Sequence, residues 1–332
     1  MSEAEATLAF QRLSPDEVLD AVEELGFRCS GRLLALNSYE NRVYKVDLDD
    51  GEALVAKFYR PARWSDEAIS EEHAFAIELA DLDIPVVPPL TINGTSLHHH
   101  NDFRLSLSPC FGGRAPDLDR LDLLTQLGRL VGRIHLQGAR SPFSARPDLS
   151  IESFGYEPRD FLEQSDLLPA EMLDVYVGVT DMLLEHVEES VERAGEVELL
   201  RLHGDFHPGN VLVQESRLHI VDLDDARTGP AVQDLWMFLS GDRHEQTPQL
   251  GALLSGYTEF RSFDGAELWL IEALRALRIV HYAAWLARRW GDPAFQTAFP
   301  WFNTRRYWDE HILALREQIA ALSEPPLQWQ DA

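Results

Sequence analysis

The sequence predicts a two-part α+β fold: a small N-terminal lobe with an antiparallel sheet and helices, then a larger, mostly helical C-terminal lobe. Two observations support this prediction. Strand-like runs and turn signals crowd the first part of the chain, and helical periodicity takes over from Asp117 onward. We place the lobes at residues 1–111 and 112–332, because Gly112 and Gly113 supply flexibility inside the proline-bounded stretch 109–116.

The N-terminal lobe is expected to alternate helices and short strands. Ser14 followed by Pro15 and Glu17 is typical of a helix start, and Gly26 of a helix end. Ser65 begins a second helix in the same way, and this helix is expected to run to about Leu82. The expected strands of the sheet are 42–48, 53–59, 86–90 and 104–108, with a hairpin turn at 49–51.

The C-terminal lobe is expected to be built around amphipathic helices. Apolar residues recur at three-to-four spacing from Leu124 to Ile134, which predicts one buried helical stripe. Further helices are expected at about 170–194, 233–239, 249–260 and 266–290. Two short strands, 210–213 and 218–221, are expected to interrupt them.

Composition narrows the class of protein. The chain has 332 residues, 45% of them hydrophobic, and a net charge of −27, which disfavours nucleic acid and anionic membranes as partners. No apolar run approaches the roughly 20 residues that span a bilayer, and the acidic start MSEAEATLAF lacks the features of a secretory signal. Because only Cys29 and Cys110 are present, we expect no disulfide framework and a reducing, cytoplasmic location.

Three polar residues form the strongest chemical pattern. Asp205 lies in the run HGDFHPGN, Asn210 follows five residues later, and Asp222 comes after a short apolar strand. In phosphoryl transfer one carboxylate orients the acceptor hydroxyl, while an amide and a second carboxylate hold Mg²⁺ against the phosphates of ATP. A polar loop that only satisfies backbone donors is the alternative for any one of these residues. The three together predict Asp205 as the catalytic residue and Asn210 and Asp222 as metal ligands.

Three further residues are candidate contacts to a nucleotide. Lys57 lies in an apolar strand, where a lysine needs an acidic partner or an anion. Glu72 falls on the buried face of the helix that follows, so we expect it to pair with Lys57, whereas Glu71 lies off that face. Ser38 belongs to a glycine-free turn placed where phosphates would lie, although a plain hairpin turn is the alternative.

Other polar positions have two readings each. Asp224 follows Asp222 on the same side of an extended segment and is a candidate for a second metal, while Asp225 is expected to face water. Asp234 either caps a helix or braces the backbone of the loop that carries Asp205. The stretch 266–290 carries four arginines, Arg275, Arg278, Arg288 and Arg289. It is read either as a basic groove for an acidic peptide or phosphorylated product, or as a core helix with a charged face.

The sequence resembles a known family. HGDFHPGN followed by VDLDDA is similar to the aminoglycoside phosphotransferase-like branch of the protein-kinase superfamily, which includes choline and homoserine kinases. Longer stretches, LNSYENRVY, VAKFYRP, LRLHGDFHPGN and VDLDDARTGPAVQDLWM, resemble more closely a group of bacterial Ser/Thr protein kinases of the stress response. The resemblance covers almost the whole chain and implies a two-lobed protein-kinase-like fold.

The resemblance also implies roles. It makes Asp205 the proton acceptor, Asn210 and Asp222 the Mg²⁺ ligands, and Ser38 an ATP contact, with Lys57 and Glu72 carried over by motif position. HGD replaces HRD, DLD replaces DFG, and no activation segment of the usual kind follows Asp222. We expect a monomer that phosphorylates Ser or Thr in a protein substrate, its own chain included. The alternatives are a kinase for the hydroxyl of an amino alcohol, sugar or antibiotic, and a nucleotide-sensing module without catalysis.

Overall fold

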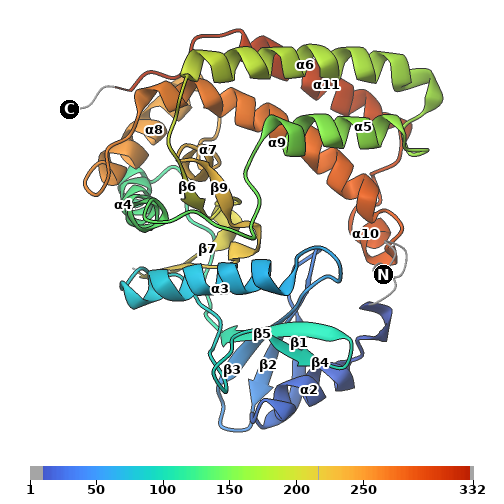
Figure 1. Cartoon of the computed structure of the whole chain (residues 1–332), viewed down its shortest axis with the longest axis vertical. Coiled ribbons are helices and arrows are strands. Elements are labelled where there is room, and N and C mark those ends of the chain that lie inside the picture. Colours follow the sequence, from blue (N-terminus) through green and yellow to red (C-terminus); the bar gives the residue numbers. More distant parts are fainter. Residues whose placement is uncertain (1–9, 216, 330–332) are drawn as a thin grey trace. The chain divides into compact units, whose positions relative to one another are not determined.

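The computed structural model describes residues 10–215 and 217–329, and these pack as two compact units (Figure 1). Unit 1 comprises the described residues up to Pro116 together with Phe143–Arg146 and Pro208–Ala226. Unit 2 comprises Asp117–Pro142, Pro147–His207 and the described residues from Arg227 onward. The chain therefore crosses between the units several times, in addition to the lobe boundary that the sequence predicts after residue 111.

Unit 1 is built on a five-stranded sheet in the order β1-β2-β3-β5-β4. All neighbouring strands are antiparallel, and the register between β2 and β3 aligns Val43 with Lys57. The strands are β1 (Cys29–Ala35), β2 (Arg42–Leu48), β3 (Ala53–Phe58), β4 (His98–His100) and β5 (Phe103–Pro109). The helices of this unit are η1 (Phe10–Arg12), α2 (Pro15–Glu24) and α3 (Asp66–Asp81).

The helix caps in unit 1 are those that the sequence predicts. The side chain of Ser14 accepts a hydrogen bond from the backbone N–H of Glu17, and that of Ser65 accepts one from Ala68. Each bond satisfies a donor that the first helical turn leaves unpaired. The buried face of α2 packs with residues of the sheet, including Val46 and Phe58, in one apolar core.

A second piece of chain completes unit 1. Strands β7 (Val211–Gln214) and β8 (Arg217–Ile220) form a two-stranded sheet between the turns η4 (Pro208–Asn210) and η5 (Leu223–Asp225). The prediction of a sheet strand at 86–90 is wrong. Val86 makes only an isolated parallel bridge to Ile220, because the two prolines that follow it lack the N–H groups that a ladder needs.

Unit 2 is mostly helical. It contains α4 (Leu121–Gly138), α5 (Glu157–Glu163), α6 (Leu173–Ala194), α7 (Gln233–Trp236), α8 (Arg243–Tyr257), α9 (Leu270–Arg289), α10 (Pro293–Ala298) and α11 (Arg305–Leu322). Shorter helical turns are η2 (Glu152–Tyr156), η3 (Ala170–Met172) and η6 (Gly265–Trp269). Strands β6 (Leu199–Leu202) and β9 (Arg227–Pro230) pair antiparallel. The antiparallel sheet of unit 1 and the helices of unit 2 confirm the α+β prediction.

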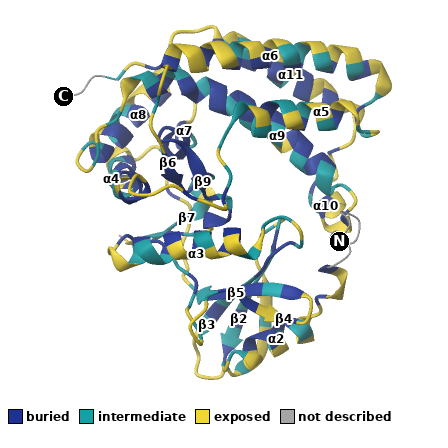
Figure 2. Cartoon of the chain, viewed as in Figure 1, coloured by how far each residue is buried: buried dark blue, intermediate teal, exposed yellow. Residues whose placement is uncertain are grey.

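Helix α9 runs through the core of unit 2. Figure 2 shows it buried over much of its length, and α6 and α11 contribute to the same apolar cluster. Trp308 of α11 is fully buried there beside Tyr176 of α6. The core reading of 266–290 therefore holds for most of this helix, and its arginines lie on the remaining face.

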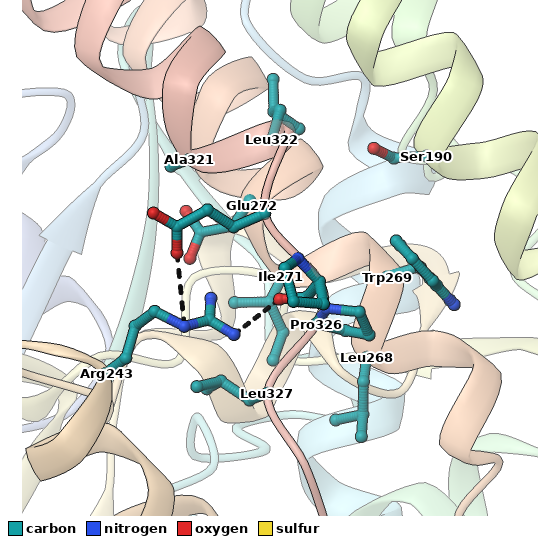
Figure 3. Close-up of a pocket in the computed structure, with 12 residues that line it drawn as sticks. Ser190, Arg243, Leu268, Trp269, Ile271, Glu272, Ala321, Leu322, Pro326 and Leu327 are labelled. Atoms are coloured by element: carbon teal, nitrogen blue, oxygen red, sulfur yellow. Dashed lines mark hydrogen bonds and ion pairs between the residues drawn. The ribbon is translucent and has the colours of Figure 1, made fainter.

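The chain that follows α11 is held against unit 2. The side chain of Arg243, labelled in Figure 3, lies 3.4 Å from the carboxylate of Glu324 and donates to the backbone oxygen of Pro325 at 2.5 Å. The cavity that these residues border has a volume of about 10 Å³. This is room for about one water molecule and excludes an organic ligand.

Two negative findings concern the described part of the chain. None of its helices is both long and apolar enough to cross a membrane. Cys29 and Cys110, its two cysteines, are both free, as expected from the absence of a disulfide pattern.

Candidate functional site

The loop that carries Asp205 is held in place by hydrogen bonds to a buried carboxylate. In unit 2, Asp234 accepts hydrogen bonds from the backbone N–H of His203 at 2.7 Å and of Gly204 at 2.9 Å. His135 of α4 contacts the same carboxylate at 3.2 Å. Asp234 makes no capping bond to α7, so its role is to brace the loop. Because Gly204 adopts φ +83°, which other residues rarely tolerate, the loop can turn sharply just before Asp205.

Asp205 is a carboxylate with an arginine and a histidine beside it. Arg278 of α9 donates to its Oδ1 at 2.6 Å, and Nε2 of His207 lies 3.5 Å from its Oδ2. Burial alone would raise the pKa of Asp205, but the hydrogen bond from His207 and the charge of Arg278 hold it well below its ordinary value. Asp205 is therefore an ionised group that can accept a hydrogen bond from a hydroxyl.

A pocket adjoins these residues within unit 2. Its volume is about 430 Å³, which is within the range of small-ligand sites. His207, Trp236, Ser240, Gln246, Arg275 and Arg278 contribute to its wall. Two of these, His207 and Arg278, are the residues that contact Asp205. The pocket therefore opens beside the loop that carries the candidate catalytic group.

The two predicted metal ligands belong to unit 1 and are joined through the backbone. The N–H of Val221 donates to the backbone oxygen of Asn210 at 3.0 Å, which ties the end of β8 to the start of β7. Asp222 follows in a left-handed conformation, with φ +63°. Strained backbone of this kind often accompanies a functional side chain. The side chain of Asp222 is 51% exposed, so its oxygens can reach a ligand in solution.

Lys57 lies against two carboxylates of the same unit. Its Nζ is 2.9 Å from Oδ1 of Asp222 and 3.1 Å from Oδ1 of Asp224. Burial alone would lower the pKa of Lys57, but these two carboxylates raise it well above its ordinary value. The strand position thus brings a half-buried ammonium group to the segment that carries the predicted metal ligand.

The predicted ion pair between Lys57 and Glu72 is not formed. Glu72 is buried on α3 as expected, yet no ion pair within 4.0 Å joins it to Lys57, and its Oε2 lacks a hydrogen-bond partner among the described residues. Burial raises the pKa of Glu72 to about 7, although the charge of Lys57 acts in the opposite direction. The Lys57–Glu72 pair does not form because Asp222 and Asp224, which come from another part of the chain, already contact the ammonium group of Lys57.

Asp224 is a buried carboxylate that contacts three polar or charged side chains of unit 1. Its side chain contacts Asn41 at 3.0 Å, Lys57 at 3.1 Å and the guanidinium of Arg63. Burial alone would raise the pKa of Asp224, but Arg63 and Lys57 lower it to about 2. These contacts make Asp224 a structural anchor rather than a candidate ligand for a second metal. Asp225 is expected to face water, but it is half-buried and also pairs with Arg63, at 2.8 Å.

The sequence does not predict the structural roles of two residues in unit 1, Glu71 and Arg146. Glu71, placed off the buried face, accepts three backbone hydrogen bonds at 2.6–3.0 Å from residues 144, 145 and 146. Arg146 is buried and donates to the backbone oxygens of Ala226 and Asp224. Together they attach the segment Phe143–Arg146 to unit 1. Only the folded chain brings these positions together, so no local pattern marks them.

The structure thus groups the predicted residues by unit. Lys57, Glu72, Asn210 and Asp222 all belong to unit 1, where Lys57 contacts Asp222 and Asn210 is joined through its backbone oxygen to Val221. Ser38, half-buried, lies in the turn between β1 and β2 of the same unit. Asp205 belongs to unit 2, next to the pocket.

Comparisons with known proteins point to one family. The model of the phosphotransferase enzyme family (APH) matches residues 32–277. "Stress response kinase A" of Salmonella choleraesuis (strain SC-B67) is 46% identical over 319 residues, covering 96% of both chains. "Serine/threonine protein kinase RdoA" of Salmonella typhimurium (strain LT2) matches with the same identity and coverage.

The fold is similar to that of solved phosphotransferase structures. Amicoumacin kinase hAmiN, in complex with AMP-PNP, Ca²⁺ and Ami, has a TM-score of 0.73 at 18% identity, and the match covers 95% of each chain. At this identity the likeness concerns the fold alone. The family match and the near-full-length relatives show that the chain belongs to the phosphotransferase enzyme family and is related to the stress response kinase A proteins.

Proposed function

We propose that this protein is an ATP- and Mg²⁺-dependent Ser/Thr protein kinase of a bacterial stress response. The observation that carries the proposal is the loop at Asp205, which a buried carboxylate braces at two backbone N–H groups. A loop held in this way presents an ionised side chain from a rigid support, as positioning a hydroxyl for phosphoryl transfer requires. The relatives named stress response kinase A and Serine/threonine protein kinase RdoA support the class of substrate.

The donor set of unit 1 suits a hard divalent cation. Asp222 offers an exposed carboxylate and Asn210 an amide, and Mg²⁺ prefers such oxygens while keeping water and phosphate in its shell. Asn210 and Asp222 would hold the ion. When bound, it would neutralise charge on the phosphates.

The remaining side chains divide between nucleotide and acceptor. Asp205 accepts the hydrogen bond of the acceptor hydroxyl and takes its proton as the phosphoryl group is transferred. Lys57 supplies positive charge and Ser38 a hydroxyl to the phosphates of ATP. Glu72 acts through Lys57, since its carboxylate raises the pKa of that ammonium group without touching it.

Transfer of ³²P from γ-labelled ATP to a generic protein, or to the kinase itself, tests the proposal. We expect Asp205→Asn to lower the rate by about 10²- to 10⁴-fold, the usual contribution of a general base. Chelation of Mg²⁺ should abolish transfer by the wild type. Asp309→Asn on α11 is the matched control, because that carboxylate is exposed and pairs only loosely with Arg305, at 3.8 Å. Equal transfer by wild type and Asp205→Asn would refute the assignment.

A second candidate is a kinase for small-molecule hydroxyls. The pocket of about 430 Å³ beside Asp205 favours it, because that volume fits a drug-sized molecule. hAmiN, a structure with this fold, is described as a kinase of amicoumacin. Release of ADP in a screen of amino alcohols, sugars and antibiotics separates the candidates. Rapid turnover of one small alcohol without transfer to any protein would favour this second function.

A further inference from the structure

The pocket beside Asp205 has an unusual charge for this protein. Arg275, Arg278 and His207 contribute to its wall, and no carboxylate does so among the residues that line it. The chain as a whole carries a net charge of −27. A chain this acidic repels anions over most of its surface, so a pocket lined by two arginines is a local exception.

Arg278 holds the group that the acceptor must reach. Its Nη1 lies 2.6 Å from Oδ1 of Asp205, and its side chain is 43% exposed, so the guanidinium can turn into the pocket without being desolvated, while Oδ2 of Asp205 keeps His207 at 3.5 Å. While this contact lasts, one oxygen of Asp205 is engaged and the carboxylate is a weak base. Binding of the acceptor hydroxyl therefore benefits from a second anion that draws Arg278 away.

Arg275 lies one helical turn before Arg278 on α9 and faces the same pocket. Its guanidinium lies 5.5 Å from the ring centroid of Trp236 and 3.4 Å from Oε1 of Glu272. The Glu272 contact is longer than a strong charge-assisted hydrogen bond, so Arg275 can accept a better anionic partner. The two arginines are thus arranged as a pair along one wall.

Resting on the proposed protein kinase function, we propose that this pocket binds an acidic segment of the protein substrate. Carboxylates near the acceptor Ser or Thr pair with Arg275 and Arg278, and Arg278 leaves Asp205 as the acceptor hydroxyl arrives. Arg278 is a positioning and specificity residue in this scheme. A cationic acceptor, such as an amino alcohol or aminoglycoside, would place its charge against both arginines and is disfavoured.

Binding of three fluorescein-labelled peptides to the full chain tests the proposal without relying on turnover. Each peptide has one serine, flanked by glutamate, by glutamine or by lysine. We expect the glutamate peptide to bind at least about tenfold more tightly than the glutamine peptide by fluorescence anisotropy. The glutamine peptide is the comparator, because a lysine peptide would also adhere to the acidic surface.

Variants test whether the preference for the glutamate peptide over the glutamine peptide depends on the pocket. Arg275→Glu combined with Arg278→Glu should remove it, whereas Arg306→Glu on α11 should retain it, since Arg306 is 86% exposed and lies outside the pocket. Arg278→Gln alone carries the same test if the double variant does not fold. Equal binding of the glutamate and glutamine peptides, or a preference unchanged in both pocket variants, overturns the inference.

Phosphate transfer to the same peptides separates this inference from the proposed function. We expect Arg278→Gln to narrow the difference in KM between the glutamine and glutamate peptides at least severalfold, because any effect of the variant through Asp205 acts on both peptides alike. Arginine-dependent binding without transfer to any peptide or protein would refute the kinase assignment and retain the acidic-ligand pocket. Transfer with equal kcat/KM for all three peptides would refute the pocket assignment and retain the kinase.

Discussion

Two buried carboxylates near the candidate site, Asp224 and Asp234, are each contacted by several polar or charged partners. Asp234 lies beneath two backbone N–H groups, and Asp224 lies among Asn41, Lys57 and Arg63. Removing one partner of such a group leaves a charge that is buried and uncompensated, which costs more than the contact itself contributes. The chemistry of the candidate site thus depends on residues that do not touch a substrate.

Glu267 is a buried acid whose carboxylate accepts a hydrogen bond from one backbone N–H among the residues that the structure describes. Its Oε2 accepts from Val232 at 2.8 Å, and burial raises its pKa from 4.5 to about 7. Because the folded form binds the proton more tightly than the unfolded form, Glu267 favours folding at low pH. This contribution is lost as the pH rises from about 4.5 to about 7.

We predict that Glu267→Gln flattens the dependence of stability on pH. The amide keeps an oxygen for the N–H of Val232 and never ionises. Between about pH 5 and pH 8, the free energy of unfolding should fall by about 1–3 kcal/mol less in the variant than in wild type. Urea denaturation at several pH values measures this, with the exposed Glu310→Gln on α11 as control. Parallel pH profiles for wild type and Glu267→Gln would contradict the prediction.

At the scale of elements, the pair α4 and α8 is joined through glycine. A Cβ atom added at Gly128 of α4 would overlap the backbone oxygen of Leu253, and one added at Gly256 of α8 would overlap that of Thr125. The two helices therefore approach backbone to backbone, closer than side chains allow. This contact positions α4, which carries His135 to the carboxylate of Asp234.

We predict that Gly128→Ala destabilises the protein by about 1–3 kcal/mol, the usual effect of overpacking a tight contact. Gly251→Ala, on α8, is the matched control, since a Cβ there meets nothing within 4 Å. It should stabilise the protein by up to about 1 kcal/mol through helix propensity. Thermal unfolding of both variants measures the difference. Similar stabilities for the two would show that the helices are not in close contact at Gly128.

At the scale of the whole molecule, the dominant property is charge. A net charge of −27 makes the folded protein repel itself, and part of this repulsion is lost when the chain expands on unfolding. The ion pairs on the surface offset little of it, because exposed pairs contribute about 0–1 kcal/mol each. Self-repulsion among the carboxylates therefore opposes folding.

We predict that salt stabilises this protein. Raising NaCl from about 20 mM to about 500 mM shortens the screening length severalfold and weakens repulsion between surface carboxylates. The unfolding temperature should rise by several degrees at neutral pH, as measured by scanning calorimetry. KCl at equal ionic strength should give the same rise, because screening does not depend on the monovalent cation. An unfolding temperature that falls with salt would show that attractive ion pairs dominate instead.

The sequence by itself determined the local features of the fold and the order of the candidate site residues. The caps at Ser14 and Ser65 and the hairpin between β2 and β3 follow from near neighbours in the chain, and the structure contains all three. The pattern of Asp205, Asn210 and Asp222 can also be read from the sequence, since the three residues lie within one short stretch. The strand predicted at 86–90 is wrong although Val86 finds a bridge partner in Ile220, because Pro88 and Pro89 lack the N–H groups that would extend the ladder.

Only the tertiary structure decided which charges meet. Lys57 contacts Asp222 and Asp224 rather than Glu72, and Arg278 reaches Asp205 across 73 residues of sequence. The physical reason is that a charge in a folded protein pairs with whichever opposite charge the packing brings within a few ångströms. That outcome depends on how distant elements pack, and no local pattern in the sequence encodes it.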